Sequence, residues 1–122
     1  MNNVEVISAL WAAFDRFDFA AAGPLLHDSF VCDWPQSGER IRGRDNFIAL
    51  NQNYPGQWRI KIVRLLAFGD EVVTECEVSD ETVTNRAISF FRLKDGLIIH
   101  IREFWPDRME PKADRAQWVE QL

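Results

Sequence analysis

The amino-acid sequence predicts an α+β fold, in which three N-terminal helices pack on one curved, mostly antiparallel sheet. Helical spacing of apolar residues is confined to the first part of the chain, whereas the later part alternates apolar and polar residues between turn signals. Helices followed by a run of strands are typical of an α+β layout. The 122 residues are the usual size of one domain, so we expect a single domain over residues 1–122.

The three expected helices precede most of the strands. The first runs from Val4 to Phe17 with a wide apolar face, and Asn2 or Asn3 can cap its start. A short second helix follows from Asp18 to Leu26, and a third from about Asp45 to Tyr54.

The remainder of the chain predicts six strands. Turn residues such as Gln36-Ser37-Gly38, Gly69-Asp70 and Lys94-Asp95-Gly96 separate them. Their expected ranges are 30–34, 39–42, 57–68, 71–79, 82–93 and 97–105. The tail after Pro106 is polar, with Trp118 and Val119 as apolar anchors, and it can form a short helix from Lys112 onward.

Composition argues against several classes of function. A net charge of −5 does not suit a nucleic-acid partner, which usually needs a basic patch. Cys32 and Cys76 lack metal-ligand or redox spacing, and we expect reduced, buried thiols. No signal peptide or apolar run of about 18 residues is present, so we expect a cytoplasmic protein without membrane association. We also expect no metal and no cofactor, because His27 and His100 show no metal-ligand spacing and no glycine-rich phosphate loop occurs.

Asp33 is the first candidate functional residue. It stands among apolar residues at the end of a predicted strand, just before a polar turn. A carboxylate in that place can face a dry cavity, where its pKa and its chemistry change. The alternatives are a structural Asp that caps the turn, or an ion pair with Arg40 or Arg42.

The order of the elements resembles the nuclear transport factor 2-like superfamily, and within it the SnoaL-like branch, which includes polyketide cyclases and ketosteroid isomerases. The matching residues are Trp11 with Phe14, Asp18-Phe19, Phe30-Val31-Cys32-Asp33 with Ile41-Arg42-Gly43, and Ile101-Arg102-Glu103-Phe104-Trp105-Pro106-Asp107. The resemblance implies a cone-shaped α+β barrel, open at one end, with a pocket between helices and sheet. It also implies a homodimer that pairs through the outer face of the sheet.

The resemblance gives Asp33 a role, because the ketosteroid isomerases have their general base at this position. Those enzymes also place an oxyanion-stabilising Tyr on the first helix and a protonated Asp on a later strand. Here the first position holds Leu10 or Trp11, and the second holds Ser89. Each missing donor costs a transition state about 3–4 kcal/mol, so steroid isomerisation is not expected.

Glu103 is the second candidate carboxylate. Four residues of the last predicted strand share one face, Ile99, Ile101, Glu103 and Trp105. Because the others are large and apolar, we expect this face to point inward and Glu103 to lie near the mouth of the cavity. There it could divide acid and base duties with Asp33. The alternative is a structural ion pair between Glu103 and Arg42 or Arg86.

Further side chains are expected on the pocket wall or on the outer face of the sheet. The predicted pocket-lining residues are Trp11, Phe14, Trp34, Trp58, Ser89, Phe91, Ile101 and Trp105. The outer face mixes apolar and basic side chains, which suits an isologous dimer interface. Its predicted members are Arg86, Ile88, Phe90, Arg92, His100 and Arg102.

The sequence therefore supports two hypotheses. In the first, the pocket binds a small, mostly apolar organic molecule and Asp33 catalyses cofactor-free proton transfer: isomerisation, aldol cyclisation or dehydration. In the second, the same fold serves as a non-catalytic ligand-binding or dimerisation module.

Overall fold

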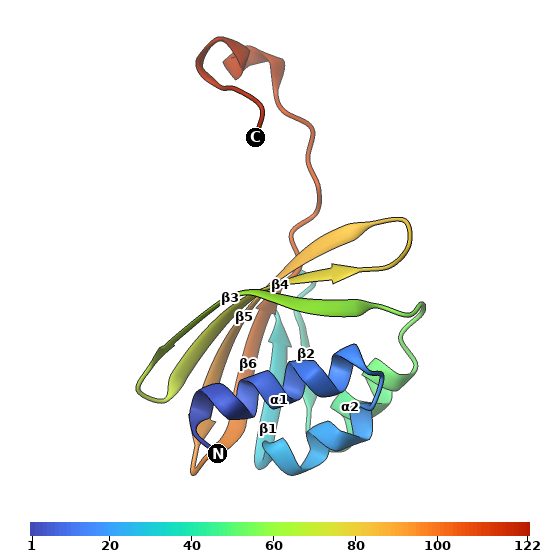
Figure 1. Ribbon diagram of the computed structural model, residues 1–122, viewed down its shortest axis with the longest axis vertical. Coiled ribbons are helices and arrows are strands. Elements are labelled where there is room, and N and C mark those ends of the chain that lie inside the picture. Colours follow the sequence, from blue (N-terminus) through green and yellow to red (C-terminus); the bar gives the residue numbers. More distant parts are fainter.

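The computed structural model describes residues 1–122 and confirms the predicted α+β fold class. Helix α1 spans Asn3–Asp15, the 3₁₀ helix η1 spans Phe19–Leu25, helix α2 spans Arg44–Gln52, and a second 3₁₀ helix, η2, spans Ala113–Trp118. The strands are β1 (Leu26–Trp34), β2 (Glu39–Arg42), β3 (Arg59–Phe68), β4 (Glu71–Ser79), β5 (Thr84–Lys94) and β6 (Leu97–Phe104). Figure 1 shows α1, η1 and α2 on one side of the curved sheet, while the C-terminal segment extends away from the domain.

The six strands form one unclosed sheet in the order β2-β1-β6-β5-β4-β3. All neighbouring strands are antiparallel except β1 and β6, which run parallel. This parallel pair lets the chain place its earliest strand beside its last one. The end of β1 and the end of β6 therefore lie side by side, and both carry residues of the site described below.

Helix α1 begins and ends through local chemistry. Asn2 accepts a hydrogen bond from the backbone N–H of Glu5, and the Glu5 side chain accepts one from the Asn2 backbone, which is a complete capping box. The predicted asparagine cap is confirmed. The helix ends before Phe17, which adopts a φ of 62° and is exposed, so Phe17 does not extend the apolar face as expected.

Strand β1 begins at Leu26, earlier than predicted. Leu26 is buried and pairs with Ile98 of β6, so hydrogen bonding to a distant strand extends β1 beyond its local signal. The expected short second helix is present as the 3₁₀ helix η1, and Pro24 inside it lacks a backbone donor.

A β-bulge in β6 changes which residues face inward. Arg92 pairs with His100, but the next residue, Leu93, pairs with Ile98, so Ile99 is the extra residue on β6. Ile98 and Ile101 are fully buried, whereas Ile99 is only partly buried. The prediction that Ile99 shares the inward face was therefore wrong, because the bulge interrupts strict alternation.

The hydrophobic core lies between α1 and the centre of the sheet. Trp11 of α1 makes edge-to-face contacts with Phe14 and Phe91, each at 6.0 Å between ring centroids. Its indole N–H also donates to the hydroxyl of Thr74 on β4, which is completely buried. Both cysteines are buried and unpaired, as expected. No helix is long and apolar enough to span a bilayer.

Candidate functional site

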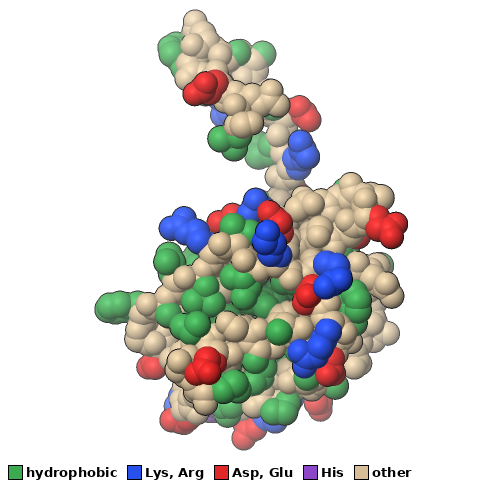
Figure 2. Space-filling view, viewed as in Figure 1, with side chains coloured by type: hydrophobic (Ala, Val, Ile, Leu, Met, Phe, Trp, Pro, Cys, Tyr) green, Lys and Arg blue, Asp and Glu red, His purple; other side chains and the backbone are tan.

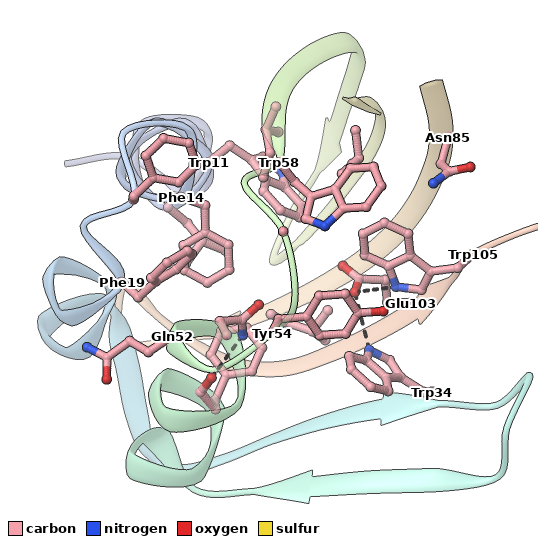
Figure 3. A pocket seen from close by; sticks show the side chains of 18 of the residues that line it. Trp11, Phe14, Phe19, Trp34, Gln52, Tyr54, Trp58, Asn85, Glu103 and Trp105 are labelled. Carbon is pink, nitrogen blue, oxygen red and sulfur yellow. Dashed lines mark hydrogen bonds between the residues drawn. The ribbon is translucent and has the colours of Figure 1, made fainter. Parts of the chain in front are cut away.

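A cavity of about 840 Å³ lies between the helices and the sheet. Six of the eight predicted lining residues are on its wall, Trp11, Phe14, Trp34, Trp58, Ile101 and Trp105. Figure 3 shows the aromatic rings among them together with Phe19 of η1 and Tyr54 of the loop after α2. Figure 2 shows hydrophobic side chains gathered on the face in view, below the C-terminal segment.

The other two residues of the predicted lining lie behind the wall. Phe91 is a core residue that packs against Trp11, and it does not line the cavity. Ser89 is also fully buried and absent from the wall, but its hydroxyl donates to the Glu103 carboxylate at 2.6 Å. Ser89 therefore supports a pocket residue and is not itself exposed to the cavity.

Glu103 contributes the buried carboxyl group of this pocket. Its side chain lines the cavity but is only 7% exposed. One oxygen, Oε1, accepts hydrogen bonds from the indole N–H of Trp34 at 3.3 Å and of Trp105 at 2.9 Å. The other, Oε2, accepts from Ser89. Figure 3 shows the carboxyl group held between the two indole edges.

The sheet brings these partners together. Strand β6 lies between β1 and β5, so Trp34 reaches Glu103 from one side and Ser89, directly opposite Glu103 in the register, from the other. Trp105 follows Glu103 by two residues and projects to the same side. No basic side chain pairs with Glu103, since Arg86 contacts Glu75 and Glu77 instead.

Burial raises the pKa of the Glu103 carboxyl above its ordinary value, although the three hydrogen-bond donors oppose this shift. A raised pKa makes a carboxyl group a better proton acceptor, which favours a role as general acid or base. The nearby thiols do not suit this role, because burial raises the pKa of Cys76 to about 11 and that of Cys32 even further.

Asp33 lies on the opposite face of the sheet, so its expected position in the pocket is corrected. Its neighbours Cys32 and Trp34 face the core and the cavity, and the alternation of β1 then directs Asp33 outward. There it accepts a bidentate pair of bonds from Arg40 at 2.6 and 2.9 Å, and a contact from His100 at 2.9 Å. These bonds hold the pKa of Asp33 well below its usual range.

The ion pair with Arg40 is the structural alternative that the sequence left open for Asp33. Asp33 and Glu103 therefore do not form a catalytic pair, because the sheet separates their carboxyl groups.

Several residues of the cavity wall were not predicted from the sequence. They include Phe19, Phe47, Tyr54, Asn85 and the two acidic residues Glu39 and Asp107. Tyr54 follows the end of α2, and in Figure 3 its ring points across the cavity toward the side that holds Glu103. The sequence predicted Tyr54 as the last residue of the third helix, before Pro55-Gly56, whereas α2 ends at Gln52 and leaves Tyr54 in the following loop.

The potential metal ligands do not cluster. No group of three or more His, Cys, Asp or Glu side chains has the geometry to hold a metal ion. The cavity instead offers aromatic faces, one buried carboxyl group and peripheral polar groups. Such a site can enclose an apolar molecule, orient one polar atom and exchange a proton with it.

Comparison with known proteins shows similarity to one domain family and to several solved structures. The family model for the SnoaL-like domain matches residues 7–101. A protein from Kribbella flavida, described as a candidate ketosteroid isomerase, is 27% identical with a TM-score of 0.92, covering 98% of this chain and 89% of its own. A protein of unknown function from Burkholderia xenovorans, described as nuclear transport factor 2-like, is 32% identical with a TM-score of 0.84, covering 98% and 94%.

A more distant structure shows the same fold. A candidate SnoaL-like polyketide cyclase from Jannaschia is 20% identical with a TM-score of 0.73, and the match covers 84% of each chain. No curated protein matches the chain.

Proposed function

Because the chain belongs to the SnoaL-like domain family, we propose that its pocket binds a small, mostly apolar organic molecule whose polar group contacts Glu103. The observation that carries this proposal is the buried Glu103 carboxyl group, held by Trp34, Trp105 and Ser89 at the wall of an aromatic cavity. The cavity volume of about 840 Å³ is within the range of small-molecule sites.

The same carboxyl group supports a second candidate function, cofactor-free acid–base catalysis. Glu103 then takes the proton-transfer role that the sequence suggested for Asp33, in an isomerisation, aldol cyclisation or dehydration. Its raised pKa and its contact with the cavity favour this assignment. Steroid isomerisation remains disfavoured, because the Ser89 hydroxyl is already bonded to Glu103 and does not line the cavity.

A thermal-shift screen against small aromatic and terpenoid ketones tests ligand binding. A ligand that occupies the pocket raises the midpoint of unfolding with its concentration. We expect Trp58→Ala to reduce the shift, because this side chain lines the cavity. Concentration-dependent shifts that persist unchanged in this variant would place the ligand elsewhere.

Catalysis is tested by deuterium exchange at the carbon next to the carbonyl group of a bound ketone, measured by mass spectrometry. Glu103→Gln is expected to abolish enzyme-dependent exchange, because an amide cannot accept that proton. Asp33→Asn is the matched control, since it also removes one carboxylate but on the outer face of the sheet. Exchange at an unchanged rate in Glu103→Gln would contradict the catalytic role of Glu103. The pocket would then be assigned ligand binding without catalysis by this residue.

We also propose that two copies pair through the outer face of the sheet. This face consists of Arg86, Ile88, Phe90, Arg92, His100 and Arg102. Phe90 is 44% exposed and packs edge-on against Phe104, whose ring also contacts the Arg102 guanidinium. Sedimentation should show a dimer that Phe90→Asp converts to a folded monomer, and an unchanged sedimentation coefficient would argue against this interface.

A further inference from the structure

The charged residues of the cavity wall all have the same sign. Glu39, Glu103 and Asp107 line the cavity, whereas no Lys, Arg or His does. Clefts that carry one sign of charge between low-dielectric walls concentrate the electrostatic potential. This cavity therefore favours a positively charged ligand over an anionic one.

Two basic side chains that are adjacent in sequence to wall residues form ion pairs outside the cavity. Arg40 follows Glu39 and binds Asp33 on the outer face of the sheet. Arg59 lies between two residues of the wall, Trp58 and Ile60, and it binds Asp15 instead. The carboxylates of the cavity thus lack a compensating cation from these positions.

The aromatic rings nearest to Glu103 suit the same type of ligand. Trp34 and Trp105 donate to the carboxyl group through their N–H edges, so both rings lie edge-on to it while they line the cavity. Trp58 donates its own N–H to the backbone of Pro55, and Tyr54 extends across the cavity (Figure 3). Faces of Trp and Tyr rings attract ammonium groups through cation–π interactions.

Glu103 can accept one more contact. A carboxylate offers about four lone-pair sites, of which Oε1 uses two for the indoles and Oε2 uses one for Ser89. An ammonium group next to Oε2 would supply the opposite charge that Glu103 lacks within the protein. Such a partner favours the ionised carboxylate and offsets its desolvation.

We infer that the ligand of this pocket is an organic cation, with an apolar body among the aromatic side chains and an amine or ammonium group beside Glu103. This inference rests on the proposed function, because it specifies the ligand class of the same cavity. It goes further by excluding carboxylate and phosphate compounds as preferred ligands. Neutral molecules of the same shape should bind more weakly.

Two probes of matched shape test the inference by titration calorimetry on the full chain. Benzyltrimethylammonium carries the positive charge, and neopentylbenzene replaces its nitrogen by carbon. We expect the cation to bind at least about tenfold more tightly, and Glu103→Gln to remove most of this preference. Asp33→Asn makes the same carboxyl-to-amide change outside the cavity, so it should preserve the preference.

Each outcome separates the inference from the proposed function. If the neutral probe binds as tightly as the cation, the inference is wrong while the apolar pocket stands. If the preference for the cation is equal in Glu103→Gln and in the wild type, Glu103 does not recognise the ligand, which also overturns the inference. If neither probe binds, both the inference and the proposed binding function are contradicted.

Discussion

Replacing Glu103 by Gln should make the protein more stable relative to the wild type as the pH rises. The pKa of Glu103 is raised in the folded chain. Above the ordinary carboxyl pKa of about 4.3, the unfolded wild type releases this proton while the folded protein retains it. The wild type therefore loses stability until the pH passes the folded pKa. Gln has no proton to release and avoids that loss.

The size of the effect follows from proton linkage. A difference of one bound proton between the two states changes the free energy of unfolding by at most about 1.4 kcal/mol per pH unit. At low pH the two proteins should agree within about 1 kcal/mol, because the Gln amide can accept from both indoles and donate to Ser89. The curve flattens at the folded pKa, so the plateau measures the shift directly.

The assay is equilibrium urea denaturation of both proteins, monitored by tryptophan fluorescence, from about pH 4 to about pH 8. Carboxylates with lowered pKa values, such as Asp15 and Asp33, destabilise both proteins equally on acidification and cancel in the difference. The reasoning is refuted if the advantage of Gln is constant or shrinks as the pH rises. Either result would show that burial does not hold the Glu103 proton in the folded state.

Three other changes probe the fold and its outer surfaces. Asp33→Asn should lower the free energy of unfolding by about 1 kcal/mol at neutral pH, because Arg40 loses its bidentate partner. The pKa of Asp33 is depressed in the folded chain, so the difference between variant and wild type should disappear as the pH falls through that pKa. Denaturation curves at several pH values measure this difference. Trp11→Phe should lower the free energy of unfolding by about 1–3 kcal/mol, because the buried Thr74 hydroxyl loses its donor. In a double-mutant cycle, adding Thr74→Val should restore part of that free energy. If the two substitutions are fully additive, the hydrogen bond does not contribute to stability. Removal of residues 108–122, all exposed, should leave the midpoint of thermal unfolding unchanged in calorimetry, whereas a clear drop would reveal packing of the tail.

Local chemistry in the sequence determined most of the helices and strands, although not the start of β1. The Asn2 cap, the apolar face of α1 and the Gly-containing hairpin turns each depend on residues close together in the chain. The ranges 39–42 and 71–79 were predicted as found, because alternation and turn residues define such strands without reference to their neighbours. The apolar alternation of Phe30, Cys32 and Trp34 also indicates that Asp33 points outward, against the role implied by the resemblance to isomerases.

Only the tertiary structure decided which side chains surround Glu103. Alternation with a period of two residues defines the two faces of a strand, but it does not identify the neighbouring strand. Pairing places β6 between β1 and β5, and this brings Trp34 and Ser89 to a carboxyl group 69 and 14 residues away in sequence. The same register produces the bulge at Ile99. The sequence by itself therefore identified Glu103 as an inward carboxylate, while long-range strand pairing supplied the indoles and the serine that hold it in the cavity.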